Sequence, residues 1–298
     1  MPAGISLHVG LNKVDPARYE GWDGALVACE NDARDMAGLA REAGFSDTVL
    51  LTPDGTVDQV TAALREAAGS LGPGDIMLFT YSGHGGQVPD AAGDDEEADA
   101  LDETLVLYDR QFLDDEVNRE FRAFADGVRI VALLDCCHSG TGIEAPGDAP
   151  GAAVRLMPPF RQQEIYARDQ GFFEELQRSL AKDSPNGAGE AAALLISGCQ
   201  DNQFSMDGDH NGAFTAALLE VWDQGAFRGG YRSFHRAIQS RLPATQSPNL
   251  YTTGTPPPHL PAPAALHGLT GRGADSTSLP QPRSAVASWA RERTSSFW

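Results

Sequence analysis

The sequence contains no apolar run of the roughly 18 residues that would cross a bilayer, and its first residues lack a basic segment followed by a long apolar run. We therefore expect no membrane partner and, by default, a cytoplasmic location. Basic side chains are also scarce: 22 Lys and Arg stand against 42 Asp and Glu, a formal net charge of -20. This excess argues against a nucleic-acid partner and favours a cationic peptide or a divalent cation.

Cysteine is rare, and its placement excludes two common uses. Cys29, Cys136, Cys137 and Cys199 have neither zinc-ligand spacing nor the pattern of a secreted disulfide framework. A reducing compartment is therefore expected. A glycine-rich phosphate loop is also absent after the first predicted strand, where residues 11–15 read Leu-Asn-Lys-Val-Asp. This absence argues against a nucleotide-binding domain.

Short apolar runs recur along the chain with helical patterns between them. They predict strands at residues 5–11, 48–52, 75–82, 104–108, 129–136, 191–198 and, as a last strand, 249–253. Helices are predicted from Asn31-Asp32 to Gly44, over 57–64, over 211–222 and over 234–242. The alternation predicts a doubly wound α/β sandwich around a mostly parallel sheet, in which ligands collect at the carboxyl ends of the strands.

Two of these predicted strands end in residues that can do nucleophilic chemistry. One ends in Tyr-Ser-Gly-His-Gly at 81–85, and another ends in Leu-Leu-Asp-Cys-Cys-His-Ser-Gly at 133–140. A thiol with an ordinary pKa of about 8.5 is only a few per cent thiolate at neutral pH, so a positioned imidazole usually activates it. The two strand ends therefore predict a cysteine-histidine dyad.

An acidic loop follows the histidine, with seven Asp or Glu among residues 93–103, and a second acidic pair, Asp114-Asp115, starts the next predicted helix. Crowded carboxylates repel one another unless something neutralises them. Oxygen-rich clusters of this kind can hold calcium, although a solvated acidic loop without a specific site is the simpler alternative.

Composition divides the chain further. Residues 144–189 are rich in Pro, Gly and Ala and carry a short helical pattern at 171–181, which predicts a long inserted connection. Residues 256–298 are rich in Pro, Ser, Thr and Gly, which predicts a flexible tail. We expect one domain over 1–255, with a large part at 1–143 and a small part at 190–255.

Three ordered motifs now give a resemblance. Tyr-Ser-Gly-His-Gly at 81–85, Asp-Cys-Cys-His-Ser-Gly at 135–140 and Ile-Ser-Gly-Cys-Gln-Asp-Asn-Gln at 196–203 resemble the metacaspases and their bacterial relatives, the caspase-like cysteine peptidases or orthocaspases, over about residues 6–253. Animal caspases match less well, because Gln-Ala-Cys-Arg-Gly is absent. The resemblance implies a caspase-like three-layer α/β/α sandwich and a cysteine endopeptidase.

The resemblance also assigns roles. Cys137, directly before His-Ser-Gly, corresponds to the nucleophile, and Cys136 points to the opposite face as packing. His84 would act as general base and later as general acid. The backbone amides of Gly85 and Cys137 are the expected oxyanion donors. His138 is the weaker candidate for the base because it adjoins the thiol in sequence.

Substrate preference follows from the residues that match the family's pocket. Asp135 and Asp32 correspond to acids that select Arg or Lys, and Ser82 completes the expected pocket. We expect cleavage after Arg or Lys and not after Asp, in peptides or proteins that carry basic residues. Plainer alternatives exist: Asp32 as a helix N-cap, Asp135 as a strand-end hydrogen-bonding group, and Cys29 and Cys199 as small buried side chains.

Calcium-dependent metacaspases bind Ca2+ through acids that match Asp102, Asp114, Asp115 and, more loosely, Glu144. Many also cut themselves in the connection after the nucleophile. The basic residues of that connection are Arg155, Arg161, Arg168, Arg178 and Lys182.

Two other functional classes stay open beside the peptidase. One is a catalytically silent caspase-fold scaffold or binding module. The presence of both dyad residues argues against it, because inactive relatives have typically lost one. The other is a legumain-type or gingipain-type peptidase, which lacks the Asp-Cys-Cys-His-Ser-Gly run. By analogy we also expect a monomer and a part in a bacterial stress or phage-defence response.

Overall fold

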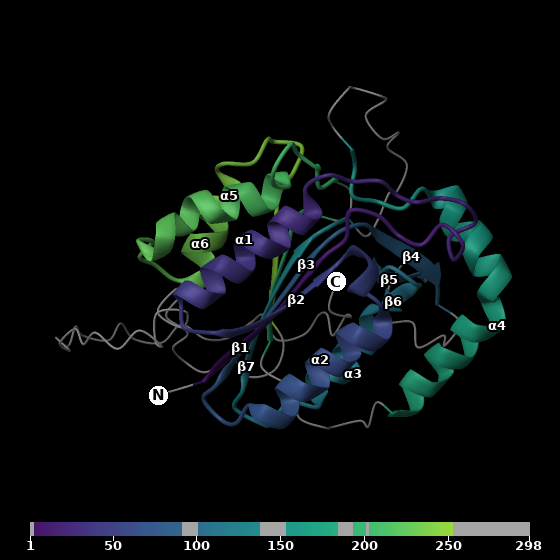
Figure 1. The fold of residues 1–298 in the computed structure, drawn as a ribbon, viewed down its shortest axis with the longest axis horizontal. Helices are drawn as coiled ribbons and strands as arrows, with labels where there is room; N and C mark the ends of the chain where they lie inside the picture. The colour runs from purple at the N-terminus through teal and green to yellow at the C-terminus, as the bar shows by residue number, and fades with distance from the viewer. Residues whose placement is uncertain (1–2, 91–100, 138–152, 184–192, 201–202, 253–298) are drawn as a thin grey trace, which may run out of the picture.

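A six-stranded sheet forms the centre of the computed structural model, which describes residues 3–90, 101–137, 153–183, 193–200 and 203–252 (Figure 1). Its strands are β1 (Gly4–Gly10), β2 (Ser46–Leu51), β3 (Ile76–Ser82), β7 (Arg129–Asp135), β8 (Ala193–Ser197) and β9 (Asn249–Thr252). They lie in the order β2-β1-β3-β7-β8-β9, and all pairs are parallel except that of β8 with β9. The expected mostly parallel sheet is confirmed.

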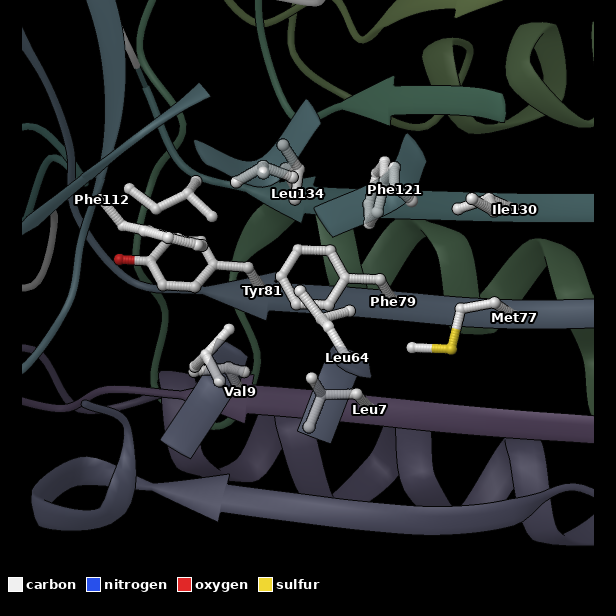
Figure 2. Close-up of a cluster of buried hydrophobic side chains, with 14 of the residues drawn as sticks. Leu7, Val9, Leu64, Met77, Phe79, Tyr81, Phe112, Phe121, Ile130 and Leu134 are labelled. Atoms are coloured by element: carbon white, nitrogen blue, oxygen red, sulfur yellow. The ribbon is translucent and has the colours of Figure 1, made fainter. Parts of the chain in front are cut away.

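Helices cover both faces of this sheet. One face carries α1 (Cys29–Glu42), α5 (Ala213–Trp222) and α6 (Tyr231–Gln239), and the other carries α2 (Val57–Ser70) and α3 (Asp114–Arg122) (Figure 1). Alternate residues of β3 pack against the two helix layers. Phe79 packs with α2 and α3 (Figure 2), while Leu78 packs with α1 and α5. The chain is thus the three-layer α/β/α sandwich that the resemblance implies.

A second, smaller sheet stands beside the carboxyl end of β3. It consists of β4 (Gly85–Pro89), β5 (Leu101–Val106) and β6 (Gln111–Leu113), all antiparallel. The prediction that residues 104–108 form a strand of the central sheet was therefore wrong, because a short apolar run reads alike in either kind of sheet. β4 itself escaped prediction, since Gly and Pro are poor strand formers.

The inserted connection contains a long helix, α4 (Pro159–Asp183), where the sequence predicted only a short one at 171–181. Its residue Asp169 has non-helical backbone angles, which marks a kink. Phe173 packs on Val88 and Leu113 of the small sheet. This contact gives α4 a buried face and fixes the chain that precedes it beside β4.

Two boundaries bear on the site. α1 begins at Cys29 and Ala28 occupies its N-cap, so Asp32 lies inside the helix and the N-cap alternative for Asp32 was wrong. α6 begins three residues before its predicted start at Phe234. Short 3-10 turns occupy Thr52–Asp54 and Asp223–Gly225. No helix among the described residues is long and apolar enough to span a membrane.

Candidate active site

His84 and Cys137 lie just beyond the carboxyl ends of two neighbouring strands. β3 and β7 pair in parallel with Ser82 opposite Asp135, so each dyad residue stands two positions past a paired residue. Both side chains are buried, His84 being 6% exposed and Cys137 0%. The strand register therefore brings the predicted imidazole and thiol to the same edge of the sheet.

The backbone and the ring of His84 are both fixed. Its carbonyl oxygen accepts hydrogen bonds from the Tyr81 hydroxyl at 2.7 Å and the Val106 amide at 3.0 Å. Its Nε2 lies 2.9 Å from the Gly24 carbonyl oxygen, and the Trp22 ring lies 4.9 Å away between centroids. These contacts hold the imidazole in one orientation.

The same contacts define which ring nitrogen can act as a base. Burial lowers the pKa of His84 to about 4, so the ring is neutral at pH 7. Since a carbonyl oxygen only accepts, Nε2 carries the proton. Nδ1 is buried and makes no hydrogen bond of ordinary geometry among the described residues, while a contact of the ring with the Leu156 backbone acts to raise the His84 pKa against the effect of burial. Nδ1 is therefore the nitrogen free to take a proton.

The thiol of Cys137 sits against the segment that follows β8. Its Sγ accepts a hydrogen bond from the Ser205 amide at 2.6 Å and lies 3.6 Å from the Ser205 carbonyl oxygen. A hydrogen bond to Cys137 and burial raise the pKa of Cys199 well above its usual range. Cys136 points into the main core, as expected, and burial raises its pKa strongly. Cys29 and Cys199 are buried too.

Two backbone amides converge on one oxygen atom. The Cys137 amide donates to the Arg155 carbonyl oxygen at 3.0 Å, and the Gly85 amide donates to the same oxygen at 3.1 Å. These are the two donors that the sequence predicted for an oxyanion. The structure thus places a peptide carbonyl of the chain itself between them.

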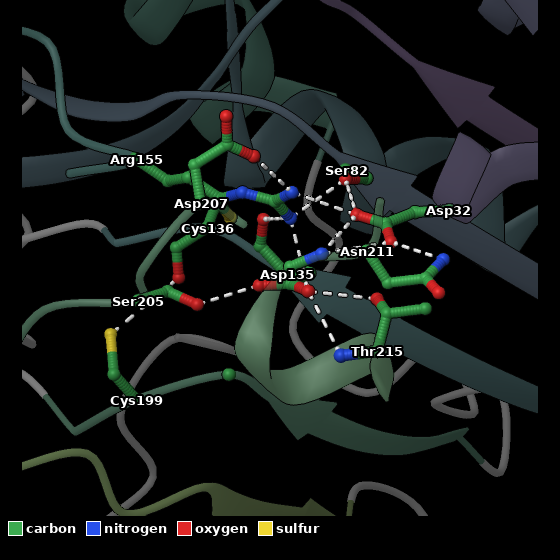
Figure 3. A network of polar contacts seen from close by, with 12 residues as sticks. Asp32, Ser82, Asp135, Cys136, Arg155, Cys199, Ser205, Asp207, Asn211 and Thr215 are labelled. Carbon is green, nitrogen blue, oxygen red and sulfur yellow. Dashed lines mark hydrogen bonds and ion pairs between the residues drawn. The ribbon is translucent and has the colours of Figure 1, made fainter. Parts of the chain in front are cut away.

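The side chain of Arg155 fills an acidic pocket and is 0% exposed (Figure 3). Its Nη2 lies 2.8 Å from both Asp32 Oδ2 and Asp207 Oδ1. Its Nη1 donates to Ser82 Oγ at 2.8 Å and lies 3.0 Å from Asp135 Oδ2. Burial acts to lower the pKa of Arg155, but the carboxylates around it, Asp135 foremost, raise it further above its usual range. All three predicted pocket residues therefore contact one guanidinium.

Each carboxylate of the pocket is also held by a backbone amide. Gly212 donates to Asp32 at 3.0 Å, Thr215 donates to Asp135 at 3.0 Å, and Val27 donates to Asp207 at 2.8 Å. Side chains add to this frame: those of Asn211, Ser205 and Thr215 donate to Asp32 or Asp135 (Figure 3). These donors lie outside the segment that carries Arg155, so the carboxylates have hydrogen-bond partners in addition to the guanidinium.

Burial shifts the pKa values of an acid and a thiol in this pocket. It raises the pKa of Asp32 to about 6, against the opposing effect of Arg155, and raises the pKa of Cys29 to about 12. A carboxylate in such surroundings is costly without a cation. The guanidinium of Arg155 therefore stabilises the charged forms of these carboxylates.

The segment around Arg155 is paired through two isolated bridges, Val154 with Met206 and Leu156 with Gly85, on either side of a bend at Arg155. Asp207 donates its amide to the Ala153 carbonyl at 2.8 Å, and the Arg155 amide donates to the Ser205 carbonyl at 3.0 Å. Beyond Arg155, the Met157 amide donates to the Gly85 carbonyl at 2.9 Å. The backbone is thus held on both sides of the Arg155–Leu156 peptide bond.

The predicted calcium ligands do not belong to the acidic pocket around Arg155. Asp102 accepts a 2.7 Å hydrogen bond from Gln177, and Asp114 and Asp115 occupy the first turn of α3. Within the described ranges, no three His, Cys, Asp or Glu side chains come together as a metal-binding group. Glu144, His138 and residues 93–100 of the acidic loop lie outside the described residues.

Sequence reasoning missed several residues of this site. Asp207, Ser205 and Thr215 come from segments that only the tertiary fold brings to Asp135, and Gly24 contributes through its carbonyl alone. Arg155 was only one of five basic residues in the connection. No local sequence signal marks Asp207, because only the tertiary fold brings its carboxylate to the guanidinium of Arg155.

Comparisons with known proteins identify the family of this chain. Residues 14–257 match the family model described as the caspase domain. The chain belongs to the caspase-domain family. It is 31% identical over 262 residues to Metacaspase-1 of Mycosarcoma maydis, covering 74% of this chain and 62% of that protein. It is 30% identical over 253 residues to Metacaspase-1A of Aspergillus fumigatus, covering 72% and 58%. The resemblance to metacaspases is thereby confirmed.

Two solved structures are also similar to this chain. Protein GSU0716 from Geobacter sulfurreducens is 46% identical, with a TM-score of 0.76, covering 86% of this chain and 96% of that one. Caspase-1 from Spodoptera frugiperda is 12% identical with a TM-score of 0.53, which shows the shared fold alone. The chain spans about 60% of the length of the metacaspases named above (62% and 58%).

Proposed function

We propose that this protein is a cysteine endopeptidase that cleaves peptide bonds after arginine, and that one of its substrates is its own Arg155–Leu156 bond. The observation that carries the proposal is the placement of Arg155. Its guanidinium is held by Asp32, Asp135 and Asp207, while its carbonyl oxygen meets the amides of Gly85 and Cys137. One residue thus meets both requirements of a cleavage site, side-chain recognition and carbonyl polarisation.

The chemistry follows from these contacts. The Cys137 thiol loses its proton to His84 Nδ1, and Sγ bonds to the Arg155 carbonyl carbon. The negative charge that develops on the carbonyl oxygen is stabilised by the two amides. His84 then returns the proton to the Leu156 nitrogen as the C–N bond breaks, which leaves a thioester between Cys137 and Arg155. Water, deprotonated by His84, releases the Arg155 carboxylate and restores the thiol.

Secondary structure supports Arg155 over the other basic residues of the connection. Arg161, Arg168, Arg178 and Lys182 all belong to α4, where the backbone is committed to helical hydrogen bonds. A peptidase binds its substrate as an extended strand, and helices resist cleavage for this reason. Arg155 precedes α4, and its amide is hydrogen-bonded to the Ser205 carbonyl, between the bridges that Val154 and Leu156 form with other segments.

The pocket also supports a basic over an acidic preference. Three carboxylates surround the guanidinium, so an Asp or Glu in its place would add a fourth negative charge to a buried site. Lysine carries a single ammonium group where arginine carries a planar guanidinium with several N–H donors. A lysine side chain would therefore keep only part of the contacts that Arg155 makes with Asp32 and Asp207. We therefore rank arginine above lysine, and both far above aspartate.

Calcium stimulation is a separate proposal. Asp102, Asp114 and Asp115 do not make a metal-binding group by themselves, and Asp102 would have to give up its hydrogen bond to Gln177. No step of the chemistry above depends on the ion. Isothermal titration of Cys137→Ala with Ca2+, beside Asp114→Asn in the same background, tests the proposal: equal heats from the two proteins would end it.

The cellular compartment, the substrates and the oligomeric state of the enzyme are proposed from fewer observations. All four cysteines are free thiols, which supports a reducing cytoplasm. Protein substrates with exposed arginine follow from the pocket, and a bacterial stress or defence response rests on analogy alone. A monomer remains the prediction, and light scattering of Cys137→Ala checks it.

Hydrolysis of matched fluorogenic peptides ending in Arg, Lys or Asp tests the peptidase itself, using wild type and Cys137→Ala. We expect cleavage after Arg, slower cleavage after Lys, none after Asp, and no activity in the variant. Cleavage by Cys137→Ala would remove Cys137 from the chemistry. A folded wild type that cuts neither itself nor any peptide would favour the catalytically silent scaffold.

A further inference from the structure

A second side chain of the segment around Arg155 is as deeply buried as Arg155 itself. Met157, the second residue after the proposed cleavage point, is 0% exposed. Its side chain belongs to an apolar cluster with the buried residues Val14, Tyr19, Val106 and Ile165, and Trp22 packs at the edge of this cluster. The cluster lies beyond the acidic pocket along the segment, on the side of the leaving amine.

The backbone of Met157 is fixed at both of its polar groups. Its amide donates to the Gly85 carbonyl at 2.9 Å, and its carbonyl accepts from Gln162 Nε2 at 2.6 Å. Gln162 in turn accepts from the Gln87 amide of β4 at 2.8 Å. The main chain is therefore held so that the side chain at this position must point into the apolar cluster.

The neighbouring side chains are much less buried than those of Arg155 and Met157. Leu156 and Val154 are only partly buried, and Ala153 is exposed. Gly86 lies beneath Met157, where an added Cβ would come within 3.2 Å of the Met157 Cε atom. Side chains of this segment thus alternate between open positions and two closed pockets, one acidic and one apolar.

We propose that the active site contains an apolar subsite for the second residue after the cleaved bond, formed by Val14, Tyr19, Trp22 and Val106. The inference rests on the proposed function and names its substrate class: polypeptides in which arginine is followed, two positions later, by an unbranched or γ-branched apolar residue such as Met or Leu. A charged side chain at that position meets no partner in the cluster and is rejected.

Self-cleavage of the full chain is the first test. Fully burying a Met or Leu side chain changes an equilibrium by about 10- to 100-fold. Met157→Ala should therefore cut itself about 10- to 100-fold more slowly than wild type, and Met157→Leu within about threefold of it. Phe160→Ala is the matched control, because Phe160 is an apolar side chain of the same connection that is 57% exposed, and this variant should stay within about threefold of wild type. A Met157→Ala chain that cuts as fast as wild type overturns the subsite.

Met157 also contributes to the folded domain, so peptides supplied in trans separate binding from folding. The probes are quenched fluorescent peptides with Ala-Val-Arg-Leu-Met-Pro, and its Leu, Ala and Asp variants at the Met position, with Ala at the Leu position as control. We expect kcat/KM to fall at least about tenfold from Met to Asp and to change little in the control. Equal rates across the Met-position series overturn the subsite, even where Met157→Ala slows self-cleavage.

These outcomes are distinct from failure of the proposed function. Cleavage after Arg in all peptides with no dependence on the later position removes the subsite and leaves the arginine peptidase. The absence of cleavage in the chain and in every peptide removes both.

Discussion

The Cys137 amide donates a 3.0 Å hydrogen bond to the Arg155 carbonyl oxygen, so the proposed nucleophile is bonded through its backbone to the peptide group that it would attack. The Gly85 amide binds the same oxygen from the small sheet. Under the proposed function, the chain itself would therefore occupy the substrate position, held by backbone hydrogen bonds on both sides of the Arg155–Leu156 peptide bond. The following predictions test the parts of this arrangement.

Removing the cation from the pocket should destabilise the uncut protein. In a Cys137→Ala background, Arg155→Met leaves the carboxylates of Asp32, Asp135 and Asp207 without their buried partner. Breaking a buried ion pair from one side costs about 3–5 kcal/mol. Arg155→Lys keeps a positive charge and should lose less. Denaturant unfolding measures both, and an Arg155→Met protein as stable as its parent would contradict the buried network.

Gly24 should be sensitive to substitution because its carbonyl holds His84. It has a φ of +56°, and an added Cβ would lie 2.8 Å from the Trp22 ring and 3.1 Å from His84 Cδ2. Gly24→Ala should displace the imidazole and lower kcat by about 10- to 100-fold. Gly21→Ala is the control, since Gly21 also has positive φ (+82°) but nothing within 4 Å of the added atom. Equal kcat for the two variants would remove Gly24 from the positioning of His84.

Thr215 should set the quality of arginine recognition without touching the substrate. Its hydroxyl donates to Asp135 Oδ2 at 2.7 Å. Thr215→Val leaves a buried carboxylate short of one donor, which costs about 1–3 kcal/mol. We expect KM for Arg peptides to rise by roughly tenfold with kcat nearly kept, since 1.4 kcal/mol is tenfold. Thr215→Ser should restore KM, and a loss confined to kcat would place Thr215 in another role.

The stability of the domain should fall in mild acid because of His8. Burial, and then the charge of Arg41, lower the pKa of His8 to about 3, whereas an unfolded histidine titrates near 6.5. The unfolded chain therefore binds more protons below about pH 6.5, and stability is lost as the pH falls from there toward 3.

His8→Gln in the Cys137→Ala background removes this titration while keeping a group that can bond Thr80 Oγ1, 2.8 Å from His8 Nδ1. The parent should lose about 2–3 kcal/mol more than the variant between pH 7 and pH 4.5. Denaturant unfolding at the two pH values measures this difference. Equal losses of unfolding free energy in the parent and in His8→Gln would show that His8 is not buried as a neutral ring.

Local patterns were enough to foresee that His84 and Cys137 lie at the same edge of the sheet. Strand periodicity and the rule that ligands gather at the carboxyl ends of parallel strands placed His84 and Cys137 together, and the register of Ser82 with Asp135 explains why. The three-layer fold followed from the same periodicity, because β3 alternates between the two cores.

The remainder of the site depends on contacts between segments far apart in sequence. Asp207 reaches the pocket because residues 153–155 pair with residues 205–207, and no local pattern encodes that pairing. The same pairing distinguishes Arg155 from the four basic residues of α4, which the sequence alone treated as equals. The long α4 was missed because its early turns carry few apolar residues and its buried face depends on the small sheet.

The most direct measurement is the intact mass of freshly purified wild type and Cys137→Ala over time, with N-terminal sequencing of any fragment. We predict that wild type yields a fragment beginning at Leu156, that Cys137→Ala stays whole, and that Arg155→Gln is not cut at this bond. Wild type that stays whole while hydrolysing Arg peptides, or a first cut after Arg161, Arg168, Arg178 or Lys182, would contradict the reading of Arg155 as the bound cleavage site.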